Sequence, residues 1–209
     1  MAIKSTGESE GHFLILKKVK YSEADLIIHA LSQSGEKMSF IARGALRSKR
    51  RFGGGVLEPT HHVKLTYNVS NKTEMHTIKE AQLLQGFELI RNDYDKLDFA
   101  LTALNCVSQV SMAGDSNSST MYNLLGHLLK RLEAVTDPSE LHLLKVQFYL
   151  KFLLKQGVLE VEYWMKPFLK LAVQDTESFE SLASQKQTAV ARLLSLEKSV
   201  LQYAKNASF

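Results

Sequence analysis

Residues 42–59, ARGALRSKRRFGGGVLEP, hold the residue types in this chain that are best suited to binding a charged partner. Five of the first ten residues are basic, three glycines follow, and no carboxylate lies between Glu36 and Glu58. Arginine outnumbers lysine four to one in the stretch, and a planar guanidinium suits both phosphate binding and stacking on bases. This pattern favours a surface that binds nucleic acid.

The residues predicted to bind nucleic acid carry either a positive charge or an aromatic ring in or beside this stretch. They are Lys37, Arg43, Arg47, Lys49, Arg50, Arg51, Phe52 and Lys64. The cations would contact phosphates, and Phe52, with Phe40 and Tyr67, would stack on bases. We also expect the three glycines to make this stretch a mobile loop that closes over a strand. From charge alone, a run of solvated surface charge is an equally good interpretation.

Catalytic and metal-binding patterns are absent from the sequence. It contains no HExxH, Cx₂C, Walker A or GxGxxG spacing, and Gly53–Gly55 is not followed by the Lys-Ser/Thr of a phosphate-binding loop. His61 and His62 are adjacent, so on a strand they face opposite ways. The single cysteine, Cys106, lies in an apolar run and excludes an internal disulfide and a cysteine-based zinc site. The sequence therefore predicts no enzyme, no catalytic residue, no metal and no cofactor. A hydrolase with an unrecognised site is an alternative that a pocket gathering carboxylates or histidines would support.

The elements that must position the basic stretch follow from the apolar period. From Gly11 to about Leu84 the period is two, most clearly at Val63, Leu65 and Tyr67. The predicted strands cover residues 12–21, 25–32, 38–44, 63–69 and 75–84. Five strands in about 75 residues suit a small closed barrel of the OB type better than a sandwich, which usually needs about seven strands.

After about Asn92 the apolar period becomes that of a helix. Asp137-Pro138-Ser139-Glu140 is a strong helix start, and Gly157 is the expected stop of the helix that follows it. The predicted helices cover residues 94–112, 120–135, 141–156 and about 178–204. The predicted fold class is therefore α+β, with an OB-type nucleic-acid-binding domain over residues 1–84 and a helical domain over residues 85–209.

Charge is shared unevenly between these two regions. The chain has a net charge of +4, but residues 1–82 hold 13 basic and 8 acidic residues, a balance of +5. Such asymmetry suggests a polyanion partner for the first region. No apolar run is long enough to span a membrane, and the first ten residues lack a secretory signal. We therefore expect a cytoplasmic protein without a membrane partner.

The basic stretch resembles the bacterial RecO family of recombination mediators. The matching elements are Ala42-Arg43-Gly44, Arg50/Arg51-Phe52-Gly53, Leu57-Glu58-Pro59, Tyr21-Ser22-Glu23-Ala24-Asp25, Gly35-Glu36-Lys37 and Ala81-Gln82-Leu83-Leu84 with Phe87. The resemblance covers residues 12–100, and beyond them only the helical pattern agrees. Many members of the family also carry four zinc-binding cysteines in the helical domain, whereas this chain has one cysteine.

The resemblance implies a DNA-binding OB fold followed by a helical domain. It also implies a non-enzymatic protein of recombinational DNA repair that acts at DNA damage, associates with the bacterial nucleoid and anneals complementary strands. With RecR, such a protein helps RecA load onto single-stranded DNA coated by single-stranded-DNA-binding protein. Both single- and double-stranded DNA are expected partners. The alternative is an OB-fold RNA-binding or translation-associated module whose helical domain docks a protein, because a DNA annealer and a 2′-OH reader look alike at the level of sequence.

The lone cysteine and the dispersed histidines generate a prediction about metal content. After dialysis the purified protein should hold far less than one zinc per chain, and a chelator should leave its melting temperature unchanged, because no set of four donors is available. Elemental analysis and thermal unfolding check this. Stoichiometric zinc that survives dialysis and raises the melting temperature would contradict it.

Overall fold

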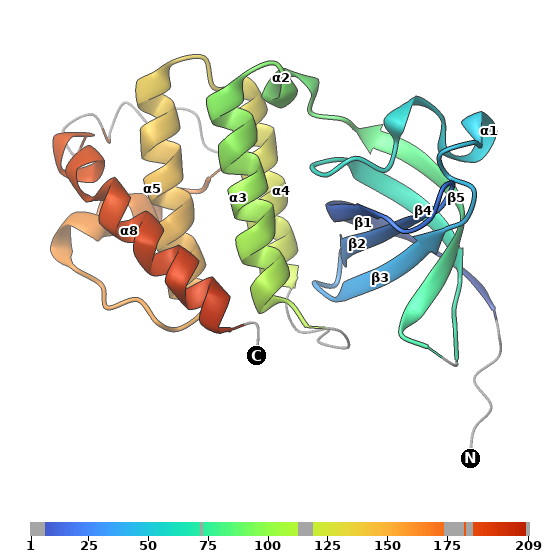
Figure 1. Ribbon diagram of the computed structural model, residues 1–209. Coiled ribbons are helices and arrows are strands. Elements are labelled where there is room, and N and C mark those ends of the chain that lie inside the picture. Colours follow the sequence, from blue (N-terminus) through green and yellow to red (C-terminus); the bar gives the residue numbers. More distant parts are fainter. Residues whose placement is uncertain (1–6, 72, 113–118, 174–181, 183–185, 208–209) are drawn as a thin grey trace. The chain divides into compact units, whose positions relative to one another are not determined.

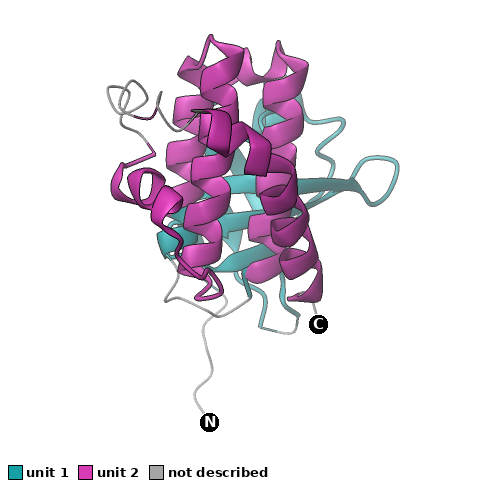
Figure 2. Ribbon diagram, turned by 90° about the vertical axis from the view of Figure 1, so that its left-hand side faces the viewer, with its two compact units in different colours: residues 1–86, 111–122 teal, residues 87–110, 123–209 magenta. Residues whose placement is uncertain are grey.

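The computed structural model describes residues 7–71, 73–112, 119–173, 182 and 186–207. The chain divides into two compact units, one formed by residues 1–86 with 111–122 and the other by residues 87–110 with 123–209 (Figure 2). The strands of the described residues, which Figure 1 labels, all belong to the first unit.

The described residues of the first unit contain five strands. They are β1 (Glu8–Lys20), β2 (Leu26–Ser32), β3 (Lys37–Ala42), β4 (His62–Asn68) and β5 (Met75–Gln85). Neighbours pair in the order β1-β2-β3-β5-β4, and β4 pairs with β1 to close a barrel. The β3–β5 pair is parallel and the other pairs are antiparallel. The predicted five-stranded fold of the OB type is confirmed.

Apolar side chains at alternate positions of the strands point inward and fill the barrel interior. Val63, Leu65 and Tyr67 are buried in the core, while the residues between them lie on the outer side. The rings of Phe13, Phe40 and Tyr67 meet edge to face, with centroids 5.1–5.9 Å apart. The quadrupoles of aromatic rings favour this edge-to-face arrangement. The three rings therefore pack together in a defined way at the centre of the barrel.

The connection between β3 and β4 differs from the mobile loop that the glycines suggested. It contains the short helix α1 (Lys49–Phe52) and the single 3₁₀ turn η1 (Gly53–Gly55). The side chain of Ser48 caps α1 by accepting a hydrogen bond from the Arg51 backbone N–H. Four side chains of the connection are buried in the barrel core: Ala45, Phe52, Val56 and Leu57. We call residues 43–57 the basic cap, because they combine this buried face with the cluster of cations.

Hydrogen bonds join the start of the basic cap, at Gly44 and Leu46, to the turn between β1 and β2. Gly44 has φ +66°, in the left-handed region that favours glycine. Its backbone N–H donates to Asp25 Oδ1 at 2.8 Å, and the N–H of Leu46 donates to the carbonyl of Ala24 at 3.0 Å. These two bonds hold the start of the basic cap in one position.

The second unit is helical, as its apolar period predicts. The helices are α2 (Glu88–Arg91), α3 (Tyr94–Val110), α4 (Ser119–Ala134), α5 (Pro138–Lys155), α6 (Lys166–Lys170) and α8 (Lys186–Asn206), with the 3₁₀ turn η2 at Tyr163–Met165; α4 begins in the first unit. Asp137 caps α5 by accepting from the Ser139 N–H at 2.8 Å. Gly157, with φ +71°, follows the end of α5. Most of residues 178–185, at the start of the last predicted helix, lie outside the described residues.

Burial of Phe52 leads to a prediction about the stability of the barrel. Phe52→Ala should lower the free energy of unfolding of the first unit by about 3–5 kcal/mol, because it removes a large buried ring and leaves a cavity. Hydrogen exchange of the strand amides measures this loss directly.

Arg50→Ala is the matched control, because Arg50 lies in the same helix and is exposed. Its effect should stay within about 0.5 kcal/mol. Fluorescence of Trp164, the one tryptophan of the chain, reports on the helical unit in both variants. Equal stability of the two variants would mean that the basic cap does not pack on the barrel.

Candidate nucleic-acid interface

The basic cap presents five exposed cations on a folded surface. Because the apolar side chains of the basic cap face the barrel core, its charged side chains face solvent. The exposed cations are Arg43, Arg47, Lys49, Arg50 and Arg51. The structure therefore brings together all five cations predicted from residues 42–59.

Arg51 ties the two halves of this cation cluster together. Its guanidinium donates to the backbone carbonyl of Arg43 at 3.0 Å, and its Nε donates to Ser48 Oγ at 3.4 Å. The guanidinium also lies over the Phe52 ring, 5.1 Å from the centroid. Arg51 thus helps to shape the basic cap, although a guanidinium keeps further N–H donors for a phosphate.

The other cations of the cluster have few partners within the chain. Arg47 pairs with Glu23 at 3.2 Å, and with side-chain exposures of 71% and 91% this ion pair is fully solvated. Exposed pairs of this kind contribute little and open readily. In the described part of the chain, no carboxylate pairs with Lys49 or Arg50. Their charge is available to an external anion.

Lys37 and Lys64, the other two predicted cations, lie apart from the cluster. Lys64 is half-buried on the outer side of β4 and pairs with Glu10 at 2.9 Å. Lys37 begins β3, whereas the basic cap follows the last residue of that strand. Five steps along a strand separate the two ends by roughly 17 Å.

Lys37 belongs instead to a second group of polar residues on the outer face of β1, β2 and β3. The strand register places Lys17 opposite His29 and His29 opposite Ser39, and His29 Nδ1 lies 3.0 Å from Ser39 Oγ. Burial, followed by the charges of Lys37 and Lys17, lowers the pKa of His29. Burial also lowers the pKa of Lys37. The equivalent face of OB folds, around strands 2 and 3, binds oligonucleotides.

The sequence alone does not determine the members of this second group, because a bulge in β1 decides which of its residues face outward. The register shifts between Ile15 and Lys17, so Lys17 faces outward and Lys18 faces the same side as its partner Ile28, a core residue. The signal available in the sequence is the alternation of β2 and β3, which places His29 and Lys37 on one face.

The aromatic residues expected to stack on bases are in the core. Phe52 is 7% exposed, Phe40 is 0% exposed and Tyr67 is 9% exposed. Their rings pack in the barrel interior because that is where closing the sheet buries the most apolar area. The expectation of an exposed stacking platform made by these three residues is therefore wrong. The exposed apolar residue of the basic cap is Leu46, at 53%.

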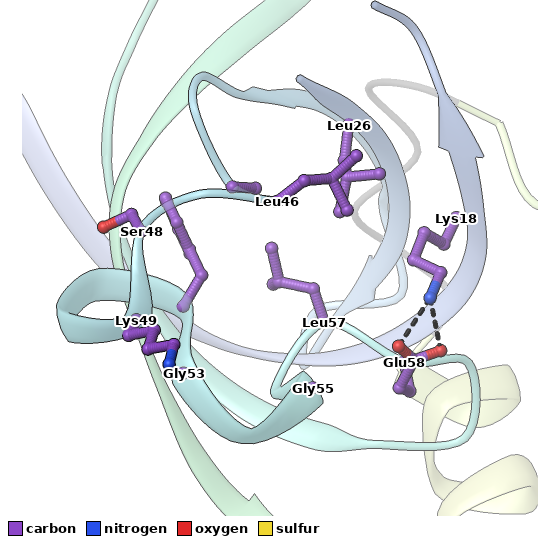
Figure 3. Close-up of a pocket in the computed structure, with 11 residues that line it drawn as sticks. Lys18, Leu26, Leu46, Ser48, Lys49, Gly53, Gly55, Leu57 and Glu58 are labelled. Carbon is purple, nitrogen blue, oxygen red and sulfur yellow. Dashed lines mark hydrogen bonds and ion pairs between the residues drawn. The ribbon is translucent and has the colours of Figure 1, made fainter. Parts of the chain in front are cut away.

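A small pocket lies between the basic cap and the barrel (Figure 3). Its volume is about 250 Å³, and its walls come from β1, β2, the basic cap and Glu58, which follows the basic cap. On one side Lys18 Nζ donates to both carboxylate oxygens of Glu58, the longer bond being 2.6 Å. The pocket holds one carboxylate and no histidine, so it does not gather the groups that a hydrolase would need.

Metal-ligating and thiol side chains were the other candidates for chemistry in this chain. They contain no group of three or more His, Cys, Asp or Glu side chains that could hold a metal ion. His61 is buried, with its Nδ1 3.0 Å from the Val56 carbonyl. Cys106 is fully buried in α3, and burial raises the pKa of its thiol to about 11.

Among the described residues, none of the helices combines the length and the apolarity needed to cross a bilayer.

Comparisons with known proteins agree with the barrel and the basic cap. Residues 8–87 match the family model described as "Recombination protein O N terminal". A protein named "DNA repair protein RecO" from Maridesulfovibrio salexigens is 30% identical over 127 residues, which cover 61% of this chain and 50% of that protein. Proteins of the same name from Syntrophus aciditrophicus and Alkaliphilus metalliredigens are each 28% identical, over 133 and 152 residues. Those matches cover 64% and 69% of this chain and 50% and 58% of the relatives. The chain thus spans about half the length of the curated relatives that it matches.

The buried thiol leads to a prediction about reactivity. In the native protein Cys106 should react with a thiol reagent at pH 8 far more slowly than a free cysteine, because its raised pKa keeps it protonated at that pH and its burial blocks access. Unfolding in guanidinium chloride should restore the ordinary rate. Fast native labelling of one thiol per chain would show that Cys106 is accessible.

Proposed function

Because the chain belongs to the RecO family through its barrel and basic cap, we propose that it is a non-enzymatic DNA-binding protein of recombinational repair that anneals complementary strands. We propose that residues 1–84 are the DNA-binding domain and that residues 85–209 are a helical domain that docks protein partners. The proposed contacts to DNA are made by the exposed cations of the basic cap, which are Arg43, Arg47, Lys49, Arg50 and Arg51. Lys64 and the Lys17–His29–Lys37 face would extend them to the barrel wall.

The observation that carries this proposal is the exposed and mostly unpaired charge of the basic cap. Five cations project from one folded segment, and Lys49 and Arg50 have no carboxylate partner among the described residues. Cations that neutralise backbone phosphates release condensed counterions and remove the repulsion between two strands. Two complementary strands can then approach and pair. This mechanism requires no acid, base or metal ion.

The names of the relatives support DNA over RNA as the partner. The matched proteins are named as DNA repair proteins, which favours this function over an RNA-binding or translation-associated module. From the family resemblance we propose RecR and single-stranded-DNA-binding protein as protein partners, loading of RecA as the purpose, and the bacterial cytoplasm and nucleoid as the location. Both single- and double-stranded DNA are proposed substrates. Phe52, 7% exposed, is proposed to support the interface from the barrel core and is not part of an exposed stacking platform.

Removing the charge of the basic cap tests the proposal. Replacing Arg47, Lys49, Arg50 and Arg51 together by alanine should abolish most DNA affinity and strand annealing. The slope of log K against log salt should become shallower by roughly three, because four phosphate contacts are lost. The loss should be similar for all sequences, since phosphate contacts do not read bases. Binding isotherms at several salt concentrations and an annealing assay give these values.

The matched control removes the same number of charges from the helical unit. Lys155, Lys170, Lys198 and Lys205 are exposed there, and their joint replacement by alanine changes the net charge equally. This control should retain annealing and most of the salt slope. A folded basic-cap variant that anneals strands at the parent rate would rule out the proposed function.

A further inference from the structure

The pocket beneath the basic cap has the size of a small planar group. Its volume is about 250 Å³, which would hold about eight water molecules at the roughly 30 Å³ that each occupies in the liquid. A nucleobase has a similar number of heavy atoms. The pocket is therefore too small for a folded peptide segment and large enough for one base.

The chemistry of the pocket walls matches a base as well. Leu26, Phe52 and Leu57 provide apolar surface, which suits the flat faces of a base. Glu58 and Lys18 provide a polar side (Figure 3). Lys18 holds the Glu58 carboxylate in place, and each carboxylate oxygen keeps a lone pair that can accept an N–H from a base edge.

The rim of the pocket carries cations that could bind the phosphates on either side of an inserted base. Lys49 lines the pocket, and Arg50 follows it in α1. No carboxylate among the described residues pairs with either cation. Phosphates on one or both sides of an inserted base would lie near these two groups. Charge and shape thus favour a nucleotide unit of a strand over an uncharged ligand.

We propose that this pocket takes one unstacked nucleobase of a single strand whose phosphates bind the basic cap. The inference rests on the proposed function, since it requires DNA at the basic cap. In a duplex each base is paired and stacked, and extracting it costs free energy. The pocket therefore adds affinity for single strands alone, and it makes the basic cap prefer single-stranded over double-stranded DNA.

Gly53 provides a way to fill the pocket without changing any charge. Gly53 lines the pocket, and its backbone has φ −64° and ψ 156°, which any residue adopts. A Cβ built there meets no atom within 4 Å. Gly53→Phe should occupy the space that the base needs, and Gly53→Ala is the matched control that leaves the pocket open.

The experiment measures the affinities of the parent and the two variants for a single strand and for a duplex of equal length. Gly53→Phe should weaken single-strand binding by about fivefold or more, the scale of one lost base contact, and leave duplex binding unchanged. Gly53→Ala should match the parent on both. Equal weakening on both substrates, or no weakening at all, would overturn the proposal.

A second measurement uses the unchanged protein and does not depend on the folding of a variant. A single strand in which several central nucleotides are abasic keeps its phosphates but offers no base. The parent should bind it about fivefold or more weaker than the intact strand, whereas Gly53→Phe should bind the two alike. Equal parent affinity for the intact and abasic strands would overturn the proposal.

Two further results separate this inference from the proposed function and from a free-nucleotide site. If the quadruple variant of the basic cap loses DNA binding while Gly53→Phe behaves like the parent, the pocket proposal fails and the function stands. The last measurement tests whether deoxynucleoside monophosphates compete with the oligonucleotide for binding. Competition by a monophosphate at concentrations close to those of the oligonucleotide would make the pocket a nucleotide site and overturn the proposal.

Discussion

Closing one end of the barrel is the constraint on which the rest of the first unit depends. A five-stranded sheet that pairs with itself has an apolar interior, and each end of that interior must be covered. The end of β1, the start of β2 and the end of β3 meet at one end, where Lys20, Leu26 and Ala42 are paired in register. The chain leaves β3 at that point, and Phe52 packs into the core beneath it. Once the apolar side chains of the basic cap face inward, its cations must face solvent. The same packing that stabilises the barrel therefore displays the charge.

Features set by local period or local hydrogen bonding could be predicted from the sequence. The alternation of Val63, Leu65 and Tyr67 identifies a strand with one buried face, because successive side chains point to opposite sides. The helix cap formed by Asp137 involves only the residues that directly follow it, so the four residues Asp137-Pro138-Ser139-Glu140 are enough to predict the start of α5. The cluster of cations in residues 43–51 was also visible, because residues close in sequence stay close in space.

Features set by contacts between distant residues could not be predicted in this way. Glycines suggested a mobile segment, but burial of Phe52 is decided by which end of the barrel needs covering, and this depends on strands before and after it. The bulge in β1 decides that Lys17 faces outward and Lys18 faces the same side as the core residue Ile28, and no local pattern marks it. The pair of Lys18 and Glu58 joins residues 40 positions apart. That pair and the basic cap both line the pocket, so the pocket also depends on contacts between distant residues.

The pairing of β1 with β4 has a consequence for how the barrel is made. Glu8 pairs with Asn68, and β3 pairs in parallel with β5, so the sheet cannot close until its last strand has been synthesised. Contacts between such distant residues slow folding, because a long loop must be ordered before they form. On the ribosome, the nascent chain would hold an unpaired edge of β3 and an uncovered apolar interior until β5 emerges. During that interval the cations of residues 43–51 keep a partly formed sheet charged, which opposes its association with other nascent chains.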